Sequence, residues 1–265
     1  MPDVENKVIV VTGASSGLGR ALALEAGKGG ARVALIARRK NILERVRKQI
    51  IDSGGEALVL PLDITNPTAV ALAMAEIESR WNNIAILFNV AGVVEPIKRL
   101  VNIDNDEMMQ SLMVNVYGVY IATREAVKMM QRRRSGGTII NISSGAAVRP
   151  YIGWTMYGSQ KAAVDHFTWT VAEEVRKTAV RIAALSPGPF ESPMQEMVRN
   201  TDKSEFPLKD KFVDLHRNKQ LPTAEKIAAM VLDMALNKWP EQSGRFTIIR
   251  DPELRSNFNG YSVKL

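Results

Sequence analysis

The chain has 265 residues, of which 46% are hydrophobic and 24% are charged. These ordinary values exclude disordered, collagen-like and coiled-coil chains, and the length suits one large or two smaller domains. The absence of cysteine excludes disulfides, thiolate nucleophiles and cysteine-ligated metals, and with two histidines in the chain we expect no metal site. The net charge of +7 leaves nucleic acid, a membrane surface and anionic small molecules to be weighed as partners.

The N-terminal residues are polar, and no apolar run approaches the ~18 residues that a membrane-spanning helix needs. We therefore expect a cytoplasmic protein without membrane contact. Along the rest of the chain, short β-branched apolar runs alternate with amphipathic stretches. The runs predict strands at residues 7–12, 32–37, 57–60, 84–89, 138–142, 180–185 and 246–249, and the stretches predict helices at residues 18–28, 42–53, 67–80, 104–133, 157–177 and 224–237.

The order of these elements predicts an α/β domain with a mostly parallel sheet, because repeated strand–helix–strand units carry the chain back over the sheet faces. Strands that are apolar throughout, rather than alternating, are covered by helices on both faces. The alternation of strand and helix patterns is interrupted at about residues 190–222, where proline, lysine and aspartate become more frequent. We expect one catalytic domain over residues 1–265, with this segment as a substrate loop or lid.

A glycine-rich turn follows the first predicted strand and leads directly into a helix, with the sequence Thr12-Gly13-Ala14-Ser15-Ser16-Gly17-Leu18-Gly19. Backbone N–H groups at a helix start, and the absence of Cβ atoms, suit such a turn to a pyrophosphate. The Gly-x3-Gly-x-Gly spacing differs from the common dinucleotide fingerprint and from the phosphate loop of NTPases. These glycines serve either nucleotide binding or merely close packing.

Three cations, Arg38-Arg39-Lys40, end the second predicted strand. A carboxylate at this place holds a ribose 2′-hydroxyl, whereas an arginine accepts a 2′-phosphate and binds it bidentately. Because no acid is present, the pattern favours NADP(H) over NAD(H), with a basic surface turn as the alternative. Asp63, after the third predicted strand, either accepts a hydrogen bond from the adenine amino group or caps the helix that begins near Pro67.

A tyrosine and a lysine are spaced by one helical turn at Tyr157 and Lys161, and Ser144 precedes the tyrosine by thirteen residues. On one face of a helix, an ammonium beside a phenol favours the phenolate and lowers the tyrosine pKa from its ordinary ~10. Two hydroxyls aimed at a carbonyl oxygen stabilise the negative charge that develops there as the carbonyl accepts a hydride. Ser143 is the neighbouring competitor for the role of Ser144.

Taken together, these motifs resemble the short-chain dehydrogenase/reductase family over about residues 7–195. The resemblance rests on Thr12–Gly19, Asn89-Val90-Ala91-Gly92, Asn115, Ser144, Tyr157, Lys161 and Pro187-Gly188. It implies a single Rossmann-type, doubly wound domain with a seven-stranded, mostly parallel sheet and helices on both faces.

The resemblance also implies a catalytic quartet of Asn115, Ser144, Tyr157 and Lys161. Tyr157 would be the general acid in reduction, Ser144 would orient the carbonyl oxygen, Lys161 would lower the tyrosine pKa and hold the nicotinamide ribose, and Asn115 would anchor a water of the proton relay. With the two arginines above, the expected cofactor contacts are Gly13, Ser15, Ser16, Gly17, Leu18, Gly19, Arg38, Arg39, Asp63, Ile64, Asn89, Ala91, Gly92, Tyr157, Lys161, Pro187, Gly188, Phe190 and Ser192.

Finer features are similar to the sepiapterin reductase and benzil reductase branch of the family, whose members reduce ketones beside a second oxygen function with NADPH. These features are Ser143–Ala147, Gly153-Trp154-x2-Tyr157 and Pro193-Met194-Gln195. The prediction is NADPH-dependent reduction of a ketone, such as a vicinal diketone or a pterin side-chain ketone, to an alcohol. Candidate substrate contacts, each also readable as core or surface, are Trp154, Met156, Met194 and Gln195.

Two other functions stay open, an NAD-dependent alcohol dehydrogenase and a catalytically silent NADPH-sensing protein. Nucleic acid is not expected as a partner, because aromatic and basic residues do not interleave along an obvious groove. The tail at residues 243–247 lacks the Asp-Gly-Gly that often ends tetrameric members, and Val90 replaces the second asparagine of the family motif. We expect a homodimer through the helices at residues 104–133 and 157–177, because relatives pair there.

Overall fold

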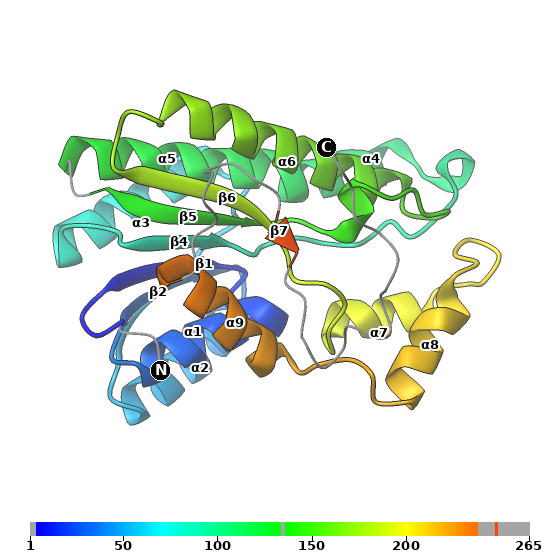
Figure 1. Ribbon diagram of the computed structural model, residues 1–265, viewed down its shortest axis with the longest axis horizontal. Coiled ribbons are helices and arrows are strands. Elements are labelled where there is room, and N and C mark those ends of the chain that lie inside the picture. Colours follow the sequence, from blue (N-terminus) through cyan, green and yellow to red (C-terminus); the bar gives the residue numbers. More distant parts are fainter. Residues whose placement is uncertain (1–3, 134–135, 238–246, 249–265) are drawn as a thin grey trace.

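The computed structural model describes residues 4–133, 136–237 and 247–248 (Figure 1). Within these residues, seven strands pair in parallel to form one sheet of order β3-β2-β1-β4-β5-β6-β7. The predicted doubly wound fold is confirmed. The strands are β1 (Val8–Thr12), β2 (Arg32–Ala37), β3 (Glu56–Pro61), β4 (Ile86–Asn89), β5 (Gly137–Ile142), β6 (Val180–Ser186) and β7 (Thr247–Ile248).

Helices connect these strands and cover both faces of the sheet. The described helices are α1 (Gly17–Lys28), α2 (Lys40–Asp52), α3 (Pro67–Trp81), α4 (Asn105–Leu112), α5 (Gly118–Arg133), α6 (Thr155–Glu174), α7 (Pro193–Asn200), α8 (Lys209–Arg217) and α9 (Ala224–Leu236). Short 3-10 turns occur at η1 (Leu100–Asn102) and η3 (Gly145–Ala147), and a π-turn, η2 (Met113–Tyr117), joins α4 to α5. The helix predicted over residues 104–133 is therefore three consecutive segments.

Each central strand is buried on both sides, as its continuous apolar sequence requires. In β1, Ile9 and Val11 pack in one core cluster with α1, α2 and α9. The alternate residues Val8 and Val10 pack in a second cluster with α3, α5 and α6. Figure 1 shows this arrangement, with α1, α2 and α9 on one side of the sheet and α5 and α6 on the other. Because side chains alternate along a strand, one apolar run supplies both cores.

The strand order leaves a crevice at the carboxyl ends of β1 and β4. From β1 the chain moves outward through β2 to β3, and β4 then returns to the opposite side of β1. The connections that follow β1 and β4 therefore run in opposite directions along the sheet. Ligands of open parallel sheets bind at such a switch point.

The segment at residues 190–222, expected as a loop or lid, contains the two short helices α7 and α8. Phe212 and Leu215 of α8, spaced by three residues, are both buried in a third core cluster with Trp154 and Tyr157. In Figure 1 the two helices lie together at one end of the molecule, beyond the sheet. The segment is thus packed against the body of the protein by an amphipathic face.

Helix α3 is capped by Asn66, whose side chain accepts a hydrogen bond from the Ala69 N–H at 3.0 Å. Asp63 does not cap this helix, which corrects one of the two interpretations of that residue. Its Oδ1 instead accepts hydrogen bonds from the Thr65 N–H and hydroxyl, each at 2.9 Å. No helix in the described part of the chain is long and apolar enough to cross a membrane.

Candidate active site

A cavity of about 890 Å³ lies at the carboxyl edge of the sheet. The residue that directly follows each strand from β1 to β6 lines it, namely Gly13, Arg38, Leu62, Val90, Ser143 and Pro187. Parallel strands deliver all their carboxyl ends to one edge, so residues far apart in the sequence converge there. This edge is where the motifs of the sequence were expected to meet.

Most of the predicted site residues line this cavity. Those that do are Gly13, Ser15, Ser16, Gly17, Leu18, Arg38, Arg39, Asp63, Ile64, Ala91, Gly92, Ser144, Trp154, Tyr157, Lys161, Pro187, Gly188, Phe190, Ser192, Met194 and Gln195. Four predicted residues do not: Gly19, Asn89, Asn115 and Met156. The structure therefore does not bring these four residues to the cavity surface.

The glycine turn has the form of an anion cradle. Gly13 has a φ of +71°, and a Cβ there would lie 2.9 Å from the Ala91 backbone, so no other residue fits without displacing the loop after β4. A Cβ on Gly19 would lie 2.4 Å from the Gly13 carbonyl oxygen, which explains this glycine by packing. Helix α1 begins at Gly17, and the Ser16 side chain makes no capping bond to it. Its first N–H groups are thus left for an anion such as a pyrophosphate.

Two arginines stand beside this cradle. Arg39 donates from Nη2 to the Ser15 hydroxyl at 2.8 Å, which holds its guanidinium against the glycine turn. Arg38 and Arg39 are both exposed and both line the cavity, whereas Lys40 does not line it. Asp63 lines the same end of the cavity and is the single carboxylate among its lining residues in the described chain. This end therefore presents positive charge to a ligand.

Asn89 supports the strands rather than the cavity. Its side-chain amide donates to Thr123 Oγ1 at 3.0 Å and to Asn141 Oδ1 at 2.8 Å, and the residue is buried. This network ties β4 to β5 and α5. The cofactor contact expected at Asn89 stays a prediction, and its side chain points into this network and not into the cavity.

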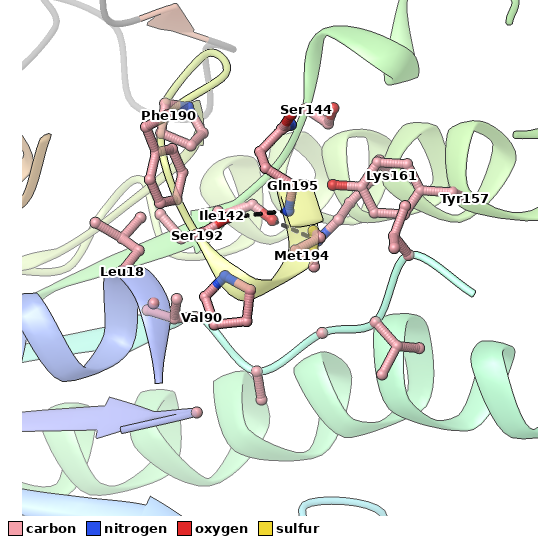
Figure 2. A pocket seen from close by; sticks show the side chains of 18 of the residues that line it. Leu18, Val90, Ile142, Ser144, Tyr157, Lys161, Phe190, Ser192, Met194 and Gln195 are labelled. Carbon is pink, nitrogen blue, oxygen red and sulfur yellow. Dashed lines mark hydrogen bonds between the residues drawn. The ribbon is translucent and has the colours of Figure 1, made fainter. Parts of the chain in front are cut away.

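Ser144, Tyr157 and Lys161 face the cavity together from the end of β5 and the first turns of α6 (Figure 2). The Ser144 side chain lies beside the Tyr157 hydroxyl, and its Oγ accepts from the Ala146 N–H at 3.1 Å. Lys161 Nζ donates to the Ile142 carbonyl at 2.8 Å and lies 5.7 Å from the centre of the Tyr157 ring. Ser144, and not its neighbour Ser143, is therefore the serine that meets the tyrosine.

Burial dominates the protonation of this cluster. Burial raises the pKa of Tyr157 above its ordinary value, with the Ser144 hydrogen bond acting in the opposite direction. The net shift of the Tyr157 pKa is therefore upward and not downward as expected, because loss of water disfavours the phenolate more than its neighbours favour it. Burial lowers the pKa of Lys161 to about 8, and the negative charge of Asp165 opposes this shift.

Asn115 lies in the π-turn η2, fully buried behind the cavity. Its side chain makes two hydrogen bonds with the Val93 backbone, accepting from the Val93 N–H and donating to the Val93 carbonyl, each at 2.8 Å. It also donates to Gln160 Oε1 at 2.6 Å. A Cβ on Gly92 would lie 3.0 Å from Asn115 Oδ1 and 3.6 Å from Lys161 Nζ, so these two groups flank the same glycine. π-Turns occur often at functional sites because they disturb the regular hydrogen bonds of a helix.

Aromatic side chains form the far end of the cavity. Trp154 contacts the rings of Tyr157, Phe206 and Phe212, with ring centres 4.8–5.7 Å apart. Phe212 lines the cavity from α8 and was not predicted, although its spacing of three from Leu215 is an amphipathic signal. Met156, the fourth expected substrate contact, does not line the cavity.

The fold and the Ser–Tyr–Lys cluster define a class, the α/β oxidoreductases that use a nicotinamide dinucleotide. The family model for short chain dehydrogenases matches residues 7–203, and the chain belongs to this family.

Individual relatives span nearly the whole chain. The chain is 30% identical over 249 residues to a benzil reductase ((S)-benzoin forming) of Bacillus subtilis, covering 92% of this chain and 99% of the relative. It is 28% identical over 235 residues to an NADP-dependent 3-hydroxy acid dehydrogenase of Schizosaccharomyces pombe, covering 88% of each. Among solved structures, the KRED1-Pglu enzyme aligns with a TM-score of 0.83 at 31% identity, covering 91% of this chain and 100% of that one.

Proposed function

We propose that this oxidoreductase is an NADPH-dependent carbonyl reductase in which Tyr157 is the general acid. The proposal rests on one observation: Ser144, Tyr157 and Lys161 lie together in the cavity that the glycine turn also lines. When bound, the nicotinamide supplies the hydride. The protein then has to hold the dinucleotide, orient the carbonyl and deliver one proton.

The cradle fits a phosphorylated dinucleotide. The free N–H groups at the start of α1 suit the pyrophosphate, and Arg38 and Arg39 suit a 2′-phosphate that NAD lacks. We assign Asp63, which lines the same end, as the acceptor for the adenine amino group. The NADP dependence stated for the yeast relative supports this cofactor choice.

The hydroxyls of Ser144 and Tyr157 both donate to the substrate carbonyl oxygen in the proposed reaction. As the carbonyl carbon accepts the hydride, negative charge grows on that oxygen, and two fixed donors stabilise it more than they stabilise the ground state. Tyr157 then transfers its proton to the oxygen, giving the alcohol. Burial raises the pKa of Tyr157, so the phenol is protonated at neutral pH, which is the state that a reductase requires.

Lys161 supports this proton transfer by charge. Its pKa of about 8 leaves it mainly protonated at neutral pH, so it stabilises the phenolate that Tyr157 becomes after giving up its proton. We also assign to Lys161 the role of binding the hydroxyls of the nicotinamide ribose. Asn115 holds the Val93 backbone and the π-turn in place, and a water bound at this turn would return protons from solvent.

The substrate that this site suits is a flat or aromatic ketone. Trp154 and Phe212 line one side of the cavity and Met194 and Gln195 another, and methionine adapts its shape to a ligand. A vicinal diketone matches the relative named as a benzil reductase, and a pterin side-chain ketone is a second substrate of this shape.

The test is NADPH consumption with benzil, simple ketones, pterins and a 3-keto acid. We expect turnover with an aromatic ketone and a loss of about 100-fold or more in kcat for Tyr157→Phe, the usual range for a general acid. NADPH binding, followed by quenching of the protein's tryptophan fluorescence, should be retained in the variant. Full turnover by Tyr157→Phe would refute the assignment, and turnover with NADH alone would favour an alcohol dehydrogenase.

We also propose a homodimer that pairs through α5 and α6. A shallow apolar hollow of about 400 Å³ lies between these helices, lined by Tyr117, Tyr120, Phe167 and Val171 among others. The rings of Tyr120 and Phe167 are stacked with centres 3.9 Å apart. Analytical ultracentrifugation should give a dimer mass, and Tyr117→Glu should shift the equilibrium toward the monomer.

A further inference from the structure

Polar groups at the end of β5 contact polar side chains along one edge of α6. Ser144 meets Tyr157, and the Ile142 carbonyl accepts from Lys161 at 2.8 Å. Because residues four apart share a helix face, the next position on this edge of α6 is residue 165. That position holds an aspartate, for which the proposed reaction gives no role.

Asp165 is a buried carboxyl group with few partners. It is 4% exposed, and the Ser143 hydroxyl lies beside it. Among the described residues, neither Asp165 Oδ1 nor Ser143 Oγ has a well-formed hydrogen bond. Burial raises the pKa of Asp165 to about 7, while Ser143 and Lys161 act in the opposite direction. A carboxylate kept in such a place depends on the nearby ammonium.

Lys161 depends on Asp165 in the same way. Lys161 is 4% exposed, and the charge that counteracts its burial is that of Asp165. The other described groups around its ammonium are neutral: the Ile142 carbonyl, the Tyr157 ring and the Asn115 amide across Gly92. The two charges form no direct ion pair among the described residues, so they interact at longer range through the buried interior, where charges are weakly screened.

We propose that Asp165 is a positioning residue for catalysis, a buried counter-charge that keeps Lys161 protonated beside Tyr157. It touches neither the cavity nor the reacting atoms, and it acts through Lys161 alone. The proposal rests on the proposed function, because the charge of Lys161 matters to turnover through the proton that Tyr157 donates.

The first test is the pH profile of NADPH-dependent ketone reduction for the wild type and Asp165→Asn. Loss of the counter-charge makes Lys161 release its proton more easily. The alkaline limb of the kcat profile should therefore shift to lower pH by about 1 unit, as expected for removal of a nearby opposite charge. Asp165→Glu should restore the limb toward its wild-type position. An unchanged limb in Asp165→Asn would overturn the proposal.

Thr168→Val is the matched control. Thr168 is buried on the same helix, where it accepts from Asn141 Nδ2 at 2.9 Å and donates to the Val164 carbonyl at 2.7 Å. Its loss should lower the melting temperature without moving the alkaline limb. An equal shift in Thr168→Val would assign the effect to packing and refute a role for the charge.

A second readout needs no turnover. The folded-state pKa of Asp165, about 7, lies above its ordinary 3.8, so the wild type should lose stability as the pH rises from about 4 to about 7. The difference in melting temperature between wild type and Asp165→Asn should follow this pH window, and a flat difference would contradict the raised pKa of Asp165. If the wild type reduces no ketone, the proposed function fails while this comparison still decides the state of Asp165.

Ser143→Ala covers the case in which Asp165→Asn does not fold. The Ser143 hydroxyl lowers the pKa of Asp165, so its removal reduces the negative charge at neutral pH. The alkaline limb should then move in the same direction as in Asp165→Asn, by less. A limb that stays in place or moves to higher pH would contradict the proposal.

Discussion

The choice between NADPH and NADH is predicted to depend on Arg39. Its guanidinium is held over the glycine turn by the 2.8 Å bond to the Ser15 hydroxyl, and among the described residues no carboxylate pairs with it. A hydrogen bond to a charged group contributes about 1.5–3 kcal/mol, which corresponds to roughly 10- to 100-fold in affinity. The side chain is exposed, so solvent and salt screen the interaction and favour the lower end of this range.

The assay is the ratio of kcat/KM with NADPH to that with NADH, measured for the wild type, Arg39→Ala and Lys40→Ala. Arg39→Ala should lower kcat/KM for NADPH about 10-fold and leave the NADH value nearly unchanged. Lys40 carries the same charge one residue further along but does not line the cavity, so its variant should leave the ratio nearly unchanged. Raised salt should reduce the wild-type preference.

Two results would refute this reasoning. If Arg39→Ala and Lys40→Ala lower NADPH turnover equally, the general positive field rather than a fitted guanidinium attracts the cofactor. If the wild type prefers NADH, the absence of an acid after β2 does not select NADP(H) in this chain, and the assignment of Arg38 and Arg39 is wrong.

Further substitutions test other parts of the site. Gly19→Ala places a Cβ 2.4 Å from the Gly13 carbonyl oxygen, so it should cost about 1–3 kcal/mol in urea unfolding, while Gly145→Ala, with nothing within 4 Å, should be nearly neutral. Gln160→Met removes the 2.6 Å acceptor of the Asn115 amide and should lower both stability, by about 1–3 kcal/mol, and kcat, with NADPH binding retained; an unchanged kcat would contradict this. Phe212→Leu should raise KM for an aromatic ketone without changing KM for NADPH, and equal changes in both would count against a substrate contact.

Regular elements were predictable because burial on both faces leaves a strong pattern. The strand at residues 32–37 has the predicted bounds, and that at 180–186 differs by a single residue. The last strand was expected at residues 246–249, of which 247–248 are described and pair with β6. The break at η2 was not predictable, since a π-turn inserts one residue per turn without changing the character of the sequence.

The two helices α7 and α8 were missed for a related reason. Helix α7 has eight residues and α8 has nine, and their buried residues are Val198 in α7 and Phe212 and Leu215 in α8. In a window that short, a loop and an amphipathic helix look alike. What makes them helices is the contact with Trp154 and the rest of the third core cluster, which no local pattern contains.

Motifs located the site but not the orientation of every side chain. The family spacing distinguished Ser144 from Ser143, and the structure brings Ser144 to the tyrosine. The same reasoning did not anticipate that Asn89 and Met156 do not line the cavity, because position along a strand end or helix does not tell which neighbour the side chain meets. The direction of the Tyr157 pKa shift was also beyond the sequence, since it depends on how completely water is excluded.

Helix α6 shows most clearly how the chain departs from ordinary helix patterning at its functional site. Its buried residues include Tyr157, Gln160, Lys161, Asp165 and Thr168, where a core-facing helix would place apolar side chains. Most of these polar groups meet a specific partner on β5 or η2, so the helix is positioned by hydrogen bonds as well as by packing. Such bonds are directional and fix the register of α6 against β5. Of the five, Asp165 has the poorest hydrogen bonding, and the proposed counter-charge role would account for a polar group retained in that state.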